Sequence, residues 1–242
     1  MSLRRGNHTN VCSMTAWPAG NRLEVPTPLA GLVPQGALRR GTVVGVGGLC
    51  DGLHQAWSAL ALSLIVEISN RGAWCALVGQ ASVGLASVVQ MGVDLGRLAL
   101  VPDPQPRGRR GWAWVVASLM EGCEAVVAWP PPDLAAADAR RLRARIRQHH
   151  SVLVVVGNWP DSVDLRLQVV GESWEGLGEG HGLLRGRRME VRAGGRAWGG
   201  RERSGWLWLP AAHGGLADGS QDPESSPAEV ERYRHQQWRS AG

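Results

Sequence analysis

GTVVGVGG, residues 41–48, is the most informative segment of this sequence about the fold, because it joins an apolar strand to a glycine-rich turn. The apolar run is nearly continuous, which is typical of a strand covered on both faces. A helix is expected to follow, because apolar residues recur at the spacing of one helical face at Leu53, Trp57, Leu60, Leu64 and Ile68. A strand, a glycine turn and a helix in this order form the context of a phosphate-binding loop.

The same alternation continues along the chain to residue 157. We expect further strands at 73–79, 97–103, 124–129 and 151–157, separated by helices at 82–91, 112–121 and 133–149. Beyond residue 160, the segments DLRLQVVGE, HGLLRGRRMEVRA and SGWLWLP read as antiparallel strands with glycine turns. The predicted fold class is therefore α/β, with a mainly parallel sheet flanked by helices, a β-rich antiparallel extension and flexible termini.

Composition divides the chain into four parts. We expect a flexible N-terminus at 1–22, a core at 23–160, a β-rich extension of the same domain at 161–210, and a linker with a short helix at 211–242. Within the core, 23–40 reads as a docking segment with turns. Glycine, serine and aspartate predict a flexible linker at 213–226. Ser226, Pro227 and Glu229 form a capping-box start for the last helix.

The overall totals exclude several classes of protein. The chain has 242 residues, 44% hydrophobic and 19% charged, which is an ordinary globular balance. We expect no membrane span and no secretory signal, since no long apolar run is present. The four cysteines are scattered without zinc spacing, which favours reduced thiols in the cytoplasm and no metal site. The net charge is +5 and all 26 basic residues are arginine, which favours phosphate or acidic partners.

The glycine turn departs from a working phosphate loop. When the template G-x-x-x-x-G-K-[ST] is placed on residues 47–54, Gly47 and Gly52 fit, but Leu53 takes the lysine position and His54 the hydroxyl position. The lysine would contact the phosphates and the hydroxyl would bind magnesium. The degenerate loop comprises Gly47, Gly48, Asp51, Gly52, Leu53 and His54.

The place of the metal-binding aspartate also differs, because the strand at 124–129 ends in Trp129 and is followed by Pro130. Two interpretations of the loop stay open. It is either a tight turn between a strand and a helix, or a weak nucleotide site that uses loop amides and the helix N-terminus. Asp51 would repel a phosphate there, which favours the tight turn. We expect no cofactor and no ATPase chemistry.

The order of these segments resembles the ATPase core of RecA over roughly residues 36–157. The carrying segments are GTVVGVGGLCDGL, RGAWCALVG, MGVDLGRLALVPD and GCEAVVAWP. The resemblance implies a catalytic glutamate just after the second core strand, and this position falls near Ala81, so the glutamate is absent.

More specifically, the chain resembles the actinobacterial ImuA-prime proteins, RecA-like accessory factors of damage-induced mutagenesis. This likeness spans most of 29–210 and includes VDLRLQVV, WEGLGEGHGLLRGRRMEVR and WLWLP, the last two of which lie outside the RecA-like core. The resemblance implies partnership with ImuB, a Y-family-like protein, and an indirect link to an error-prone replicative-type polymerase and the sliding clamp. It implies translesion synthesis in the SOS response, in the cytoplasm near the nucleoid.

Two further features point to partners. The segment 181–203 carries seven arginines and two glutamates, a net charge of +5 that equals the charge of the whole chain. These arginines are candidates for contact with single-stranded DNA: Arg185, Arg187, Arg188, Arg192, Arg196, Arg201 and Arg203. In the tail, Val230, Tyr233 and Trp238 are candidates for one apolar helix face that folds on a partner.

Several functions therefore remain in competition. The first is a non-catalytic mutasome subunit that supports ImuB. The alternatives are a RecA-like module that binds single-stranded DNA, a SulA-like inhibitor of cell division, and a weak nucleotide hydrolase with unusual ligands. Self-association is a further possibility, because RecA-like proteins form filaments and the segment 23–40 is placed where it could dock on a neighbour.

Overall fold

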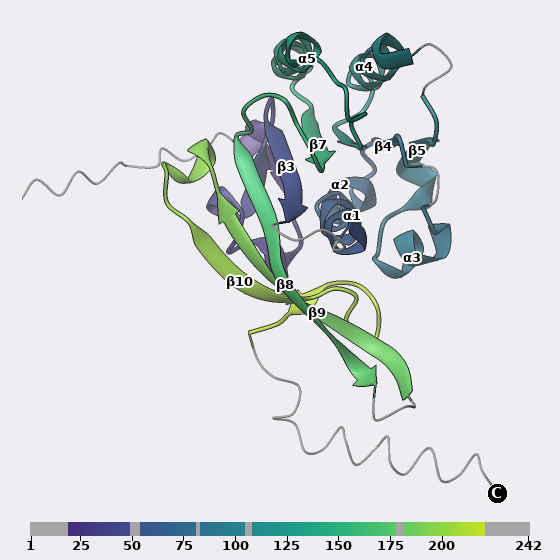
Figure 1. Cartoon of the computed structure of the whole chain (residues 1–242), viewed down its shortest axis with the longest axis vertical. Coiled ribbons are helices and arrows are strands. Elements are labelled where there is room, and N and C mark those ends of the chain that lie inside the picture. The colour runs from purple at the N-terminus through teal and green to yellow at the C-terminus, as the bar shows by residue number, and fades with distance from the viewer. Residues whose placement is uncertain (1–18, 49–53, 81–82, 105–107, 178–181, 221–242) are drawn as a thin grey trace, which may run out of the picture.

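One nine-stranded sheet organises the molecule. A computed structural model describes residues 19–48, 54–80, 83–104, 108–177 and 182–220 (Figure 1). The strand order is β11-β10-β9-β8-β3-β7-β6-β4-β5. Strands β3, β4, β5, β6, β7 and β8 run parallel, whereas β9, β10 and β11 join by antiparallel pairing. The predicted fold class is confirmed, and its parallel half is consistent with a RecA-like core.

The strands of the parallel half are short, and all but the edge strand β5 are largely buried. Their bounds are β3 (Val43–Gly48), β4 (Cys75–Val78), β5 (Leu98–Val101), β6 (Ala125–Ala128) and β7 (Val152–Val156). The antiparallel half consists of β8 (Leu165–Leu177), β9 (Gly182–Gly194), β10 (Arg203–Trp208) and β11 (Ala217–Asp218). Every residue of β4, β6 and β7 is buried, as the continuous apolar sequence predicts for strands covered on both faces.

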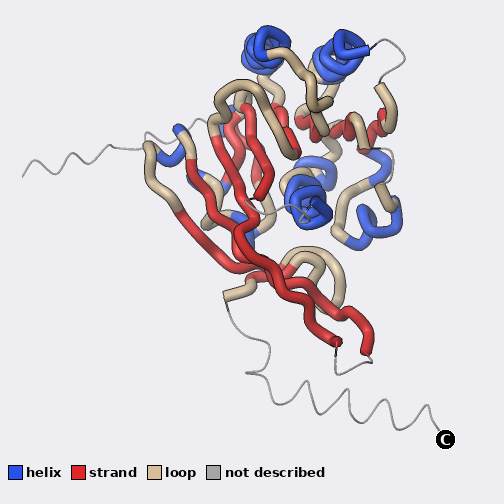
Figure 2. The backbone as a smooth tube through the Cα atoms, in the orientation of Figure 1, coloured by secondary structure: helices blue, strands red, loops and turns tan. Residues whose placement is uncertain are grey.

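Helices cover both faces of the parallel half (Figure 2). One face packs against α1 (His54–Ser63), α2 (Val66–Asn70) and α3 (Leu85–Gln90), and the other against α4 (Gly108–Leu119) and α5 (Ala136–His149). The helix expected through Ile68 is divided at Leu64 and Ile65, whose amides bond three residues back, a tighter turn than the α-helix makes. None of the described helices is long and apolar enough to cross a bilayer.

The segment 23–40 packs on its own core. Its strands β1 (Arg22–Glu24) and β2 (Ala37–Arg39) pair antiparallel, with the short 3-10 helices η2 (Thr27–Leu29) and η3 (Pro34–Gly36) between them. Its apolar side chains are buried in the cluster beneath α1 and α2: Leu23, Val25, Leu29, Leu32, Val33 and Leu38. The docking segment predicted from sequence thus packs on the core of its own chain through these side chains.

Residues 213–220 also differ from prediction, because composition places them in a flexible linker. Instead Ala217 and Asp218 form β11, which pairs with Trp208 and Leu207 of β10. The amide of Gly219 donates to the carbonyl of Trp206, and this glycine leaves no room for a side chain beside Leu207. Backbone pairing at the sheet edge gives this glycine-rich segment its order. The remainder of the predicted linker and the tail lie outside the described residues.

Two cysteines lie in the parallel half. Cys75 in β4 is fully buried, as expected for a small apolar side chain, and Cys123 is half-buried. Burial raises the pKa of the Cys75 thiol to about 12, with Cys123 and Glu124 adding to the shift. Cys75 therefore stays protonated and unreactive over the physiological range.

Candidate functional site

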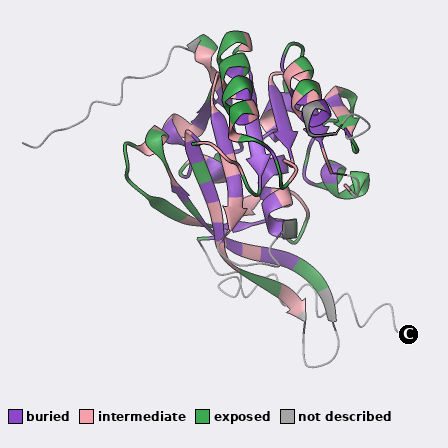
Figure 3. Ribbon diagram, turned by 45° about the horizontal axis from the view of Figure 1, so that its top comes forward, coloured by how far each residue is buried: buried purple, intermediate pink, exposed green. Residues whose placement is uncertain are grey.

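A large cleft opens where the parallel strands end. Its volume is about 1090 Å³. It is lined by the last residues of β3, by one side of α1, by the segment around α3, and by the residues that follow β6 and β7. The β8–β9 hairpin, which extends beyond the sheet in Figure 3, adds Trp174 and Arg187 to its wall. Clefts at the carboxyl ends of strands are the usual ligand sites of open α/β sheets.

The lining of this cleft is aromatic and amide-rich. Four indoles contribute to it, those of Trp57, Trp129, Trp159 and Trp174. Its polar side chains are mostly amides and hydroxyls, and its charged members among the described residues are Arg166 and Arg187, with no carboxylate. No group of three or more histidine, cysteine, aspartate or glutamate side chains in the described parts of the chain could hold a metal ion.

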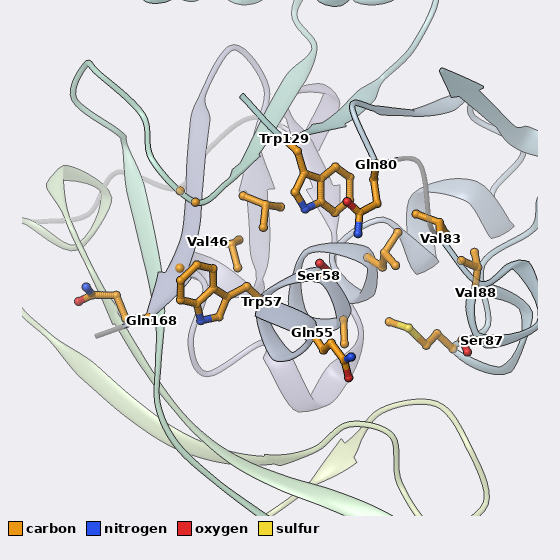
Figure 4. Close-up of a pocket in the computed structure, with 18 of the residues that line it drawn as sticks. Val46, Gln55, Trp57, Ser58, Gln80, Val83, Ser87, Val88, Trp129 and Gln168 are labelled. Carbon is orange, nitrogen blue, oxygen red and sulfur yellow. The ribbon is translucent and has the colours of Figure 1, made fainter. Parts of the chain in front are cut away.

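The glycine turn lies at one end of this cleft, and a tryptophan side chain fills the space beside it. A β-carbon added to Gly48 would come 2.5 Å from the Trp57 Nε1 atom and 2.8 Å from the Val169 carbonyl oxygen. Figure 4 shows the Trp57 indole pointing from α1 toward Val46, with Trp129 entering the same cleft from the segment that follows β6. Gly48 thus makes room for an indole and a neighbouring strand, which is a packing role.

The other residues of the degenerate loop are less informative. Gly47 also lines the cleft, and a β-carbon there would meet nothing within 4 Å. Asp51, Gly52 and Leu53 lie outside the described residues, and His54 begins α1 without a described side chain.

Substitution of the two glycines is expected to separate a packing role from a phosphate-binding role. Gly48→Ala should lower the free energy of unfolding by about 1–3 kcal/mol, because the added methyl group overpacks the contact with Trp57. Gly47→Ala is the matched control and should change it by less than about 0.5 kcal/mol. Urea unfolding of both variants measures the difference; equal stability of the two would contradict the packing role.

Trp129 takes the position at the end of β6 where the resemblance places a metal-binding aspartate. Its backbone amide donates to the Val78 carbonyl, and its carbonyl lies 2.7 Å from where a β-carbon on Gly79 would be. Gly79 has a φ of +88°, which glycine adopts without strain. The backbone therefore holds an indole at this place in the cleft, and an indole offers no oxygen ligand to magnesium.

Arg187 is the exception among the predicted DNA-contacting arginines, because it is buried. Only 4% of it is exposed, its Nε donates to the Leu209 carbonyl at 2.8 Å, and its Nη1 lies 3.6 Å from a Glu172 carboxylate oxygen. Its guanidinium also lies 5.2 Å from the Trp174 ring centroid. Burial lowers the pKa of Arg187, and Glu172 opposes the shift. The side chain faces the cleft and is not part of an exposed basic surface.

Arg188 and Arg192 lie on the face of β9 opposite to that of Arg187, because successive side chains of a strand point to opposite faces. Their neighbours Met189, Val191 and Ala193 point into the core, so the two arginines point to the opposite face. Pairing with β8 and β10 places further side chains on that face. We call it the open β face: Arg166, Gln168, Arg188, Glu190, Arg192 and Trp206. Arg166 and Gln168 also line the cleft, so the two surfaces adjoin at β8.

On the open β face, one arginine stacks on a tryptophan and two arginines have no ion-pair partner among the described residues. The Arg188 guanidinium lies 4.6 Å from the centroid of Trp206, which is 39% exposed, and its Nε donates to the Gly219 carbonyl. Arg166 and Arg192 are exposed and form no ion pair within the described residues. Arg166 was missed by sequence reasoning; the alternation in LRLQV was the available signal.

The remaining predicted arginines do not gather there. Arg185 lies near the hairpin tip, Arg196 in η6 (Arg196–Trp198), and Arg201 in the turn before β10; all three are exposed. Arg203 stacks 5.3 Å from the Trp198 centroid, and Trp198 donates to the Leu32 carbonyl, so this indole serves packing. Val230, Tyr233 and Trp238 lie outside the described residues.

Comparison with known proteins places this geometry in a family. Residues 31–161, more than half of the chain, match the family model described as the MT3502 N-terminal domain. The chain belongs to this family. It is also 33% identical over 181 residues to the uncharacterized protein Rv3395c of Mycobacterium tuberculosis (strain ATCC 25618 / H37Rv), covering 71% of this chain and 83% of that protein. The family match spans most of the parallel half, including Gly47, Gly48 and Trp129.

Proposed function

We propose that this chain is an ImuA-prime protein, a non-catalytic accessory subunit of the damage-induced mutasome that supports ImuB and an error-prone polymerase in translesion synthesis. The partnership rests on the sequence resemblance. The structural observation that supports a non-catalytic role is the cleft at the carboxyl ends of the parallel strands, where Trp57 closes on Gly48 and Trp129 takes the place of a carboxylate.

This cleft suits a scaffold better than a magnesium-nucleotide site. A phosphoryl-transfer site needs a lysine on the phosphates and oxygen ligands for the metal. The whole chain contains no lysine, and the described lining of the cleft has no carboxylate. In such a protein the RecA-like core serves to position surfaces for partners.

Co-purification with ImuB tests the proposed partnership. The full chain is expected to retain ImuB, and a variant with Val230, Tyr233 and Trp238 changed to alanine is expected to retain much less. The matched control is Gln236→Ala with Gln237→Ala, which alters the same tail without its apolar residues. Failure of the full chain to retain ImuB would overturn the partnership, and full retention by the apolar variant would exclude the tail as its carrier.

Calorimetry with magnesium-ATP tests the non-catalytic part separately. No turnover is expected at any protein concentration. Measurable release of phosphate by the wild-type chain that disappears in a Trp129→Ala variant would contradict this part and favour a hydrolase with unusual ligands.

A second candidate function, binding of single-stranded DNA, is favoured by the open β face. This face carries three arginines and one glutamate, and Trp206 on the same face is 39% exposed. Basic side chains that follow a phosphate backbone and aromatic rings that stack on bases are the usual elements of such sites.

Fluorescence anisotropy with a labelled oligothymidine at two salt concentrations tests this second function. Arg166→Gln with Arg192→Gln is expected to weaken binding and to reduce the salt slope by about 0.7 for each phosphate that the variant no longer neutralises. The control Arg141→Gln with Arg145→Gln removes the same charge from α5. Equal weakening of oligothymidine binding in both double variants would indicate nonspecific electrostatic attraction and would contradict a DNA site on the open β face.

A further inference from the structure

A second cavity, which is basic, lies at the end of the parallel sheet opposite to the cleft, where β3 begins. Its volume is about 700 Å³. Its polar side chains come from three separate parts of the chain: Arg39 and Arg40 precede β3, Arg147 and His150 lie at the end of α5, and Asp164 precedes β8. The backbone of Gly41 and Thr42 completes its floor.

The single carboxylate in this cavity is already engaged. One Asp164 oxygen accepts a hydrogen bond from the Val43 amide at 2.9 Å and lies 3.5 Å from a nitrogen of Arg143. Arg40 is engaged as well, because it forms an ion pair with Glu124 at 2.7 Å and lies 3.5 Å from the His150 carbonyl. That contact places a cation at the negative end of the α5 dipole.

Arg39 and Arg147 are the two cations left without a counter-charge. Both are exposed, and neither forms an ion pair or a side-chain hydrogen bond within the described residues. An adjoining cavity of about 140 Å³ is lined by Arg39 and also by Arg196, another arginine without an ion pair in the described parts of the chain. The cavity therefore carries positive charge that the surrounding protein does not neutralise.

The backbone around this charge is firmly held. Gly41 has a φ of +77°, and a β-carbon on it would lie 3.5 Å from the Arg147 Cα, so the turn passes directly against the end of α5. The Gly41 amide donates to the Ser151 carbonyl and the Leu153 amide to the Thr42 carbonyl. These bonds hold the backbone turn that follows Arg39 and Arg40 against the end of α5 and the start of β7.

We infer that this cavity, at the amino end of β3, is a phosphate-binding site in which Arg39 and Arg147 hold the anion from two sides. Guanidinium groups present paired donors that match phosphate oxygens, and two of them on separate elements suit one tetrahedral anion. The site is separate from the cleft at the other end of the strands and from the open β face. The phosphate can belong to a free anion or to the backbone of a nucleic acid, since the recognising chemistry is the same.

Paired variants of the full chain test the site. Arg39→Gln with Arg147→Gln should weaken binding by at least about tenfold, since both charge-assisted hydrogen-bonding groups are removed. The control Arg141→Gln with Arg145→Gln removes equal charge from exposed positions of α5 and should stay within about twofold of wild type. Calorimetry with pyrophosphate and anisotropy with an oligothymidine, at one low salt concentration, are the two measurements.

The two measurements identify the source of the phosphate. Weakening confined to pyrophosphate assigns a free anion, and weakening confined to the oligonucleotide assigns a nucleic acid backbone; either supports the site. Absence of wild-type binding to both probes overturns it, as does equal weakening in the control. Thermal unfolding of each variant separates a binding defect from a folding defect. Arg166→Gln with Arg192→Gln should leave pyrophosphate binding unchanged, which distinguishes this site from the open β face.

Discussion

Replacement of Trp112 by alanine is expected to lower the free energy of unfolding by about 3–5 kcal/mol. Trp112 is 1% exposed and belongs to the core cluster between α4 and the parallel sheet. Its indole approaches β4 at Gly79, where an added β-carbon would come 3.4 Å from the Nε1 atom. Truncation leaves a cavity under α4 that the close-packed strands cannot fill. Urea unfolding followed by circular dichroism measures the decrease in stability.

Two other substitutions control for this effect. The Trp112 Nε1 atom is buried without a hydrogen-bond partner in the described structure, so Trp112→Phe keeps most of the apolar contact and removes an unsatisfied donor. Its cost should be well below that of alanine. Trp114 on the same helix is 62% exposed, and its replacement by alanine should cost less than about 1 kcal/mol. A Trp112→Ala variant as stable as Trp114→Ala would contradict the packing that we describe.

Arg187→Ala is expected to be the second most costly change, at about 2–4 kcal/mol. It leaves the buried Leu209 carbonyl without its side-chain donor and Glu172 without its nearest cation. Glu172 is 22% exposed, so water compensates part of this cost. The substitution also removes the guanidinium stacked on Trp174 at the wall of the cleft. Urea unfolding gives the stability, and tryptophan fluorescence reports the change beside Trp174.

Methionine at position 187 separates the contribution of the guanidinium charge to stability from that of the apolar part of the side chain. Arg187→Met retains an unbranched apolar side chain, so it should recover part of the stability that alanine forfeits. The exposed neighbour Arg185, changed to alanine, should alter stability by less than about 0.5 kcal/mol. If Arg187→Ala behaved like Arg185→Ala, the side chain would belong to the solvent-exposed surface predicted from sequence.

The case of Arg187 shows why the candidate DNA-contacting residues could be predicted only in part. Seven arginines within 181–203 form one cluster along the chain, but the strand β9 sends successive side chains to opposite faces. A bulge in the pairing of β8 with β9 between Glu175 and Leu177 further changes the register near the hairpin tip. Linear charge density therefore cannot separate a buried arginine from one on the open β face.

The course of the segments 23–40 and 213–220 depends on tertiary contacts for a related reason. Apolar residues between turns indicate that a short segment will pack against some surface. They do not indicate whether that surface belongs to the same chain or to a partner. Leu29 and Val33 are buried in their own core, and Gly219 is held by a backbone bond to Trp206. Both outcomes depend on contacts with residues distant in the sequence.

The parallel half of this protein is predictable from the amino-acid sequence, because continuous apolar strands alternating with amphipathic helices leave few ways to bury both faces of the sheet. The altered glycine loop is predictable as well, since a missing lysine is visible without coordinates. The packing of Trp57 against Gly48, the orientation of Arg187 toward the cleft, and the shared cavity of Arg39 and Arg147 became visible only in the folded structure. These are contacts between elements far apart in the chain, and their distances follow from how the sheet and helices pack together.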